Sequence, residues 1–112
     1  MIWPVKAVFL TVYRWFIEPM IIGLLQASIS LPEARSLKDK RMVIRSIKDR
    51  ALNRMNVSIA EVGHQNSWRR SDLAFVTISA EKSVVEKRLS EIGEFLRSNP
   101  RYVLIDYRTE LL

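Results

Sequence analysis

The sequence predicts one α+β domain whose helices and strands follow in the order β-α-β-β-α-β. Residues 21–31 alternate between two sets of side chains with the two-residue period of a half-buried strand. Residues 36–54 and 83–98 instead place their apolar residues at the spacing of an amphipathic helix. With 112 residues, the chain is long enough for one domain with a modest core.

The first half of this domain is predicted to be a strand, a turn and a helix. Pro32 ends the strand, and Ser36 offers a side-chain cap to the helix. Asp39 follows three residues later, near the positive end of the helix dipole, and the helix should continue to about Arg54. The apolar side of the helix is formed by Leu37, Ile44, Ile47, Ala51 and Met55.

The second half repeats the pattern after a hairpin. Its predicted elements are strands over Val57–Gly63, Asp72–Ser79 and Tyr102–Arg108, and a helix that Ser79 or Ser83 caps and that ends at about Ser98. Right-handed crossovers and one hairpin then give a ferredoxin-like βαββαβ sandwich. In this fold an antiparallel sheet carries two helices on one face.

The opposite face of the sheet is expected to be open. It is predicted to carry Leu24, Ile59, Leu73 and Phe75 among polar residues. Because an open face with this much apolar area usually meets another subunit, we expect a homodimer formed through it or through an edge strand.

The net charge of +6 lies in one segment, between Arg35 and Arg54. This segment holds eight bases and two acids, whereas bases and acids balance in the rest of the chain. A concentrated basic field of this kind is typical of proteins that bind a polyanion. The charge therefore predicts a class of partner, and it predicts no reaction.

Four of these bases share one side of the first helix. At about 100° per residue, Lys38, Arg41, Arg45 and Lys48 occupy an arc of about 80° beside the apolar stripe. Together with Arg35, they are the predicted contacts to a nucleic-acid backbone. The alternative is an incidental basic face, with Lys40 and Arg54 extending from the edge of the core to solvent.

A second nucleic-acid contact is predicted at the hairpin, where Trp68, Arg69 and Arg70 are adjacent. An aromatic ring beside arginine is a common pairing for stacking on an unpaired base. In the alternative, Trp68 folds back onto the sheet, and the two arginines pair with Glu61 or Asp72.

Catalytic, metal and cofactor sites are not predicted. The chain has no cysteine and a single histidine, which excludes thiolate and histidine-rich metal sites, and it has no glycine-rich phosphate loop. We therefore expect a protein that is not an enzyme. The alternative is an active site at the hairpin, where Glu61, His64 and Asp72 could approach one another and Ser67 could act as a nucleophile.

Residues 1–19 are expected to be an extension that precedes the domain of residues 20–112. Their apolar run Ala7–Tyr13 is too short to span a bilayer as a helix. The segment is read as the product of an upstream start codon, or as an amphipathic tail that touches a membrane through its aromatic residues. We expect a cytoplasmic protein, because the absence of cysteine fits a reducing compartment.

Two sequence blocks resemble a known family. They are Ser36–Arg41 (Ser-Leu-Lys-Asp-Lys-Arg) and Ala60–Gln65 (Ala-Glu-Val-Gly-His-Gln), and from Met20 to about Arg108 the chain resembles the YlxP-like or DUF503 family of small bacterial proteins of unknown function. The resemblance implies a ferredoxin-like domain, often dimeric, encoded beside translation initiation and ribosome maturation factors. It implies no catalytic residues, since the family has no established reaction.

These observations together predict a small basic factor that associates with RNA or the ribosome and binds phosphate backbone without catalysis. Ribosome maturation or translation is the process that the resemblance suggests. The alternatives are a protein–protein adaptor or homodimeric interaction module, and an enzyme at the hairpin of residues 61–72.

Overall fold

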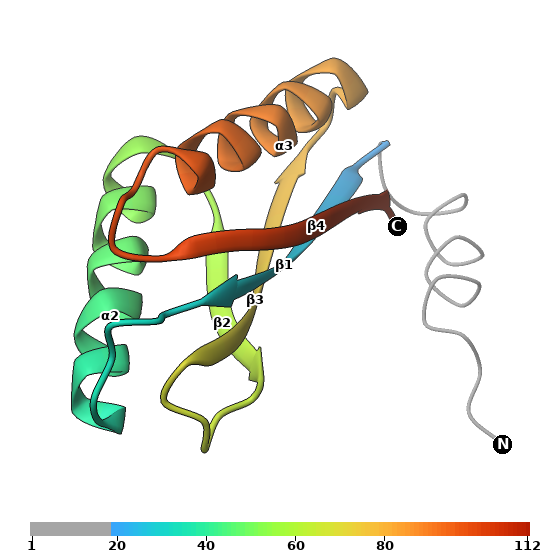
Figure 1. Cartoon of the computed structure of the whole chain (residues 1–112). Helices are drawn as coiled ribbons and strands as arrows, with labels where there is room; N and C mark the ends of the chain where they lie inside the picture. Colours follow the sequence, from blue (N-terminus) through green and yellow to red (C-terminus); the bar gives the residue numbers. More distant parts are fainter. Residues whose placement is uncertain (1–18) are drawn as a thin grey trace, which may run out of the picture.

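The computed structural model describes residues 19–112, which form six elements in the predicted order (Figure 1). The elements are β1 (Ile21–Ser30), α2 (Leu37–Arg54), β2 (Ser58–Gly63), β3 (Arg70–Ser79), α3 (Lys82–Arg97) and β4 (Val103–Leu111). The predictions about residues 1–18 lie outside the described part of the chain.

The four strands form one antiparallel sheet in the order β2-β3-β1-β4. Each helix connects two strands that are separated by one other strand, β1 to β2 through α2 and β3 to β4 through α3. This is the ferredoxin-like arrangement, and the predicted α+β fold is confirmed.

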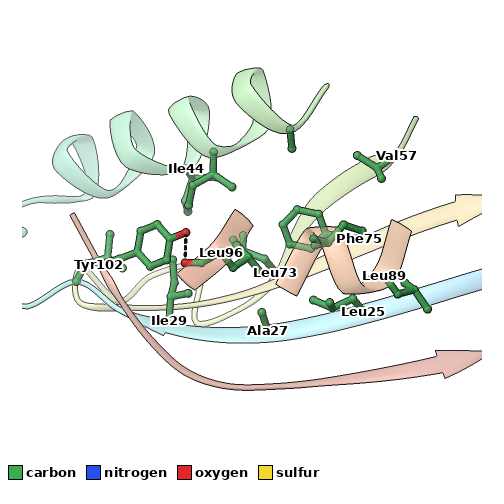
Figure 2. Close-up of a cluster of buried hydrophobic side chains, with 14 of the residues drawn as sticks. Leu25, Ala27, Ile29, Ile44, Val57, Leu73, Phe75, Leu89, Leu96 and Tyr102 are labelled. Carbon is green, nitrogen blue, oxygen red and sulfur yellow. Dashed lines mark hydrogen bonds between the residues drawn. The ribbon is translucent and has the colours of Figure 1, made fainter. Parts of the chain in front are cut away.

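The core lies between the two helices and one face of the sheet (Figure 2). In the central strand β1, Leu25, Ala27 and Ile29 are buried, as the two-residue period predicted. The register pairs Leu25 with Phe75 and Ala27 with Leu73, so the core side chains of β1 and β3 lie next to each other.

This register corrects the predicted open face. Leu73 and Phe75 are fully buried beneath the helices, and Ile59 packs against the same core; only Leu24 lies on the open face. Both faces of β3 carry apolar residues, so the alternation along this strand did not show which face the helices cover. The register with β1 determines that the helices cover the face of β3 that carries Leu73 and Phe75.

The first helix begins where the sequence predicted. The Asp39 amide donates to Ser36 Oγ at 3.1 Å, and the Arg35 amide donates to Asp39 Oδ2 at 2.9 Å. The predicted cap of α3 is wrong, because Glu81 is the N-cap residue and no side chain caps this helix. Ser79 Oγ accepts from the Glu81 amide instead, which orders the turn before the helix.

Within residues 19–112, no helix is long and apolar enough to cross a membrane.

Candidate nucleic-acid interface

The basic arc, defined as Lys38, Arg41, Arg45 and Lys48, runs along one side of α2. The first three of these residues are exposed and Lys48 is half-buried. Arg35, just before the helix, is also exposed. The arc lies beside the buried stripe of the helix, as its spacing predicted.

The cations of the arc have no carboxylate partner among residues 19–112 within salt-bridge distance. Arg41, Arg45 and Lys48 line an open depression of about 270 Å³, together with Asp49 and Glu61. Because three of the four cations are exposed and none forms an ion pair with a described carboxylate, they produce a positive surface along the helix.

The exposed side of α3 differs in charge pattern. It carries Glu86, Lys87, Glu91, Glu94 and Arg97, and Arg97 forms an ion pair with Glu94 at 3.3 Å. Mixed charges of this kind make an ordinary solvated surface. Of the two described helices, α2 alone therefore presents a positive surface.

The hairpin turn presents the second predicted contact. Trp68 is 50 % exposed, and the side chains of Arg69 and Arg70 are exposed as well. In the described chain no ion pair joins either arginine to Glu61 or Asp72. Arg69 Nε instead donates to the carbonyl of Ala34 at 3.3 Å, next to Arg35.

Lys40 joins the hairpin to α2. The sequence suggested that this residue extends to solvent; in the structure it is 1 % exposed, which corrects that interpretation. Its ammonium lies 2.9 Å from Glu61 Oε2 and donates to backbone carbonyls of the hairpin. Figure 1 accordingly shows the β2–β3 turn and the first turns of α2 at the same end of the molecule.

Sequence reasoning missed the role of Lys40, although a signal was present. Lys40 precedes Ile44 by four residues and Ile47 by seven, so it occupies the apolar stripe of the helix. A lysine at such a position either extends its ammonium to solvent or is buried, and a buried ammonium needs acceptors. Glu61, the one charged residue of β2, supplies one of them.

The structure does not bring together all four residues of the alternative enzyme site. Glu61 is bound by Lys40 and by Ser71, whose hydroxyl donates to it at 2.7 Å. His64 Nε2 lies 3.7 Å from Asp72 Oδ2, on the other face of the sheet. Glu61 pairs with Leu73 and lies on the face beneath the helices, whereas Asp72, the next residue along β3, lies on the open face, so the two carboxylates are on opposite faces of the sheet. The Ser67 amide donates to the His64 carbonyl and belongs to the turn.

The open face of the sheet has a polar end and an apolar end. The polar end is an open pocket of about 450 Å³ whose polar lining residues are Gln26, Ser28, Asp72, Asp106 and Arg108. Ser28 donates to Asp72 at 2.6 Å, and Arg108 donates twice to Gln26 Oε1, at 3.0 and 2.7 Å. Residues 19–112 contain no group of three or more histidine, aspartate or glutamate side chains that could hold a metal ion.

The two sequence blocks that carry the family resemblance meet in this interface, since Lys40 belongs to the first block and Glu61, His64 and Gln65 belong to the second. The model of a family described as a protein of unknown function, DUF503, matches residues 22–109. The chain belongs to the DUF503 family. It is 34 % identical over 90 residues to the uncharacterized protein YlxP of Bacillus subtilis (strain 168), across 80 % of this chain and 98 % of that protein. The family predicted from the two blocks is thus confirmed, and in this DUF503 chain the blocks are joined by a buried lysine.

Proposed function

We propose that the protein is a small, non-catalytic RNA-associated factor that binds the phosphate backbone of RNA, including the RNA exposed on ribosomes, with the basic arc of α2 and the hairpin turn. The observation that carries the proposal is the exposure of Arg35, Lys38, Arg41 and Arg45, none of which has a carboxylate partner in residues 19–112. A positive surface of this kind attracts a polyanion.

The spacing of the arc suits a phosphate backbone. Each turn of the helix presents one cation, and successive cations are about 5 Å apart along the axis. Arginine outnumbers lysine in the chain, and its guanidinium binds phosphate through two parallel hydrogen bonds. Several phosphates could therefore be neutralised at once.

Binding of this kind releases counterions and depends steeply on salt. With four or five phosphates neutralised, the logarithm of the affinity should fall with the logarithm of the salt concentration with a slope of about −3 to −4. The affinity should depend little on base sequence, because phosphate contacts carry no sequence information.

The test compares two variants with the same change in net charge. Arg41→Glu with Arg45→Glu reverses two cations of the arc, and Lys82→Glu with Lys87→Glu reverses two exposed cations of α3. Binding to purified ribosomal RNA is measured by filter retention over a series of salt concentrations. We expect the first variant to lose at least about tenfold in affinity and to show a shallower salt slope, and the control to stay within about twofold of wild type.

Equal binding by the wild type and the Arg41/Arg45 variant at moderate salt would contradict the proposal. An equal loss in both variants would show that net charge alone matters and would remove the basic arc as the site.

A protein adaptor is the second candidate, because two large apolar side chains are exposed on α2. Met42 is 57 % exposed and Leu52 is 55 % exposed. An acidic protein partner could bind both the cations and these side chains. Partners that survive nuclease digestion in a pull-down, and that are lost on Met42→Ser with Leu52→Ser, would favour the adaptor; partners lost on digestion would favour RNA.

A further inference from the structure

The loop between β2 and β3 is tied to α2 on both sides of Trp68. Before Trp68, the carbonyls of His64 and Gln65 accept hydrogen bonds from Lys40 Nζ at 2.8 and 3.2 Å. After it, the carbonyl of Arg70 accepts from the same ammonium at 3.3 Å. The backbone on either side of the indole is thus held relative to the helix, while the indole is half-exposed.

A second set of contacts ties the loop to the segment that precedes α2. Arg69 Nε donates to the carbonyl of Ala34 at 3.3 Å, and the amide of Leu31 donates to the carbonyl of Arg69 at 2.9 Å. Arg35, one of the predicted phosphate contacts, directly follows Ala34. The loop and the beginning of the basic surface are therefore neighbours whose relative position is set by the protein itself.

Lys40 is suited to positioning and not to contacting a ligand. Its three N–H groups face four oxygen acceptors, the three carbonyls and Glu61 Oε2, and no donor is left over. A buried ion pair is in general a weak source of stability, and apolar side chains of similar volume often serve as well. An apolar side chain, however, cannot donate hydrogen bonds to carbonyls at the two ends of a loop.

The conformation of His64 supports this interpretation. Its φ is 56°, in the left-handed region that residues other than glycine seldom adopt. Its carbonyl makes the shortest of the three backbone contacts to Lys40, and it also accepts from the Ser67 amide at 3.0 Å. The ammonium therefore stabilises a turn that is intrinsically unfavourable.

We propose that Lys40 is a positioning residue that holds Trp68 beside the basic arc, and that this combined surface takes RNA in which an unpaired base adjoins the bound backbone. The inference rests on the proposed RNA-binding function and adds the class of RNA. A base inside a duplex is not available for stacking on an indole, whereas a bulged or terminal base is. A loop held in place before binding loses little conformational freedom when it binds.

The test uses two labelled RNA duplexes that differ by one unpaired adenosine, and the full chain. Fluorescence anisotropy gives the two affinities, and their ratio is the preference for the unpaired base. We expect the wild type to prefer the bulged duplex by about tenfold, the size expected of one base–aromatic stack. Trp68→Ala should abolish this preference, so that the ratio of the two affinities falls to about one, whereas Trp68→Phe should retain most of the preference.

Lys40→Met tests the positioning role, with circular dichroism to check that the variant is folded. We expect this variant to lose the preference while its affinity for the paired duplex stays within about twofold of wild type, because the basic arc remains. A general loss of folded protein would lower both affinities together and leave the ratio unchanged. If Lys40→Met does not fold, Asn66→Gly with Ser67→Gly loosens the same exposed loop without touching the core, and the same loss of preference is expected.

The outcomes separate the two proposals. A wild type that binds both duplexes equally, or a folded loop or Lys40 variant that keeps the full preference, would overturn this inference and leave backbone binding by the basic arc intact. A wild type that binds neither duplex at moderate salt would overturn the proposed function and this inference with it.

Discussion

The phenolic hydroxyl of Tyr102 donates a hydrogen bond of 2.7 Å to the backbone carbonyl of Leu96 (Figure 2). Leu96 lies in the last turn of α3, where backbone carbonyls lack partners within the helix. Tyr102 directly precedes β4 and is 5 % exposed. This hydrogen bond thus gives one of the last carbonyls of α3 a donor, and it links the end of the helix to the residue that precedes β4.

This contact predicts a loss of stability at alkaline pH. Burial raises the pKa of Tyr102 to about 12, with nearby Arg50 acting in the opposite direction. In the unfolded chain the Tyr102 hydroxyl loses its proton near pH 10, whereas in the folded protein it keeps the proton up to about pH 12. The stability that this buried hydroxyl contributes is therefore complete below pH 10 and is lost as the pH rises to about 12. The loss should amount to about 2 to 3 kcal/mol of unfolding free energy.

Urea unfolding of wild type and Tyr102→Phe over this pH range measures the effect. At neutral pH the variant should be less stable by about 1 kcal/mol, because the Leu96 carbonyl loses its donor. The difference between the two proteins should shrink or reverse as the pH rises, since only the wild type carries this titrating group. A constant difference across the range would contradict the prediction and assign the alkaline loss to other groups.

Neighbouring residues of β3 should differ sharply in their effect on stability, because they lie on opposite faces of the sheet. Phe75 is fully buried, and Phe75→Ala should lower the free energy of unfolding by about 3 to 5 kcal/mol. Val76 lies half-buried on the open face, and Val76→Ala should cost about 1 kcal/mol or less. Chemical denaturation of both variants measures the two values, and equal costs would mean that the sheet does not present Phe75 to the helices.

Gly23 is required by the close approach of β1 to α3. A Cβ at this position would lie 2.5 Å from Val85 Cγ1 and 3.1 Å from Leu89 Cδ1. Gly23→Ala should therefore destabilise the protein by about 1 to 3 kcal/mol through overpacking.

A double-mutant cycle with Val85→Ala identifies the cause of that loss. Val85→Ala makes room at the clash, so the double variant should be more stable than the sum of the two single effects predicts. Strictly additive effects would mean that the backbone conformation of residue 23, and not the contact with Val85, explains the cost.

The predicted homodimer stays a prediction, and the structure changes the residues that would form it. The apolar end of the open face consists of two cross-strand pairs, Ile22 with Ile78 and Leu24 with Val76. Ile78 is 46 % exposed, so this patch is available to a second copy. We expect sedimentation equilibrium at micromolar concentration to give a dimer for wild type and a monomer for Val76→Lys, with unchanged circular dichroism. A monomeric wild type, or a Val76→Lys dimer, would exclude this face as the contact.

Local patterns were enough to predict the elements and their order. The alternation in β1 correctly assigned Leu25, Ala27 and Ile29 to one face, and Ser36 correctly marked the beginning of α2. The positions of the basic arc followed from helix geometry alone. The patterns failed at β3, where both faces are apolar, and at α3, where neither Ser79 before the helix nor Ser83, its second residue, is the cap.

The amino-acid sequence by itself determined the order of helices and strands, the side of α2 that carries the cations, and the family of the chain, because periodicity, charge and motifs depend on residues near one another along the chain. Only the tertiary structure decided that Phe75 belongs to the core and that Lys40 holds the hairpin. Both facts depend on strand register and on contacts between residues far apart in the sequence, such as the ammonium of Lys40 and the carbonyls 24 to 30 residues away. Whether a charged side chain in an apolar stripe is buried is settled by the acceptors that the rest of the fold brings to it.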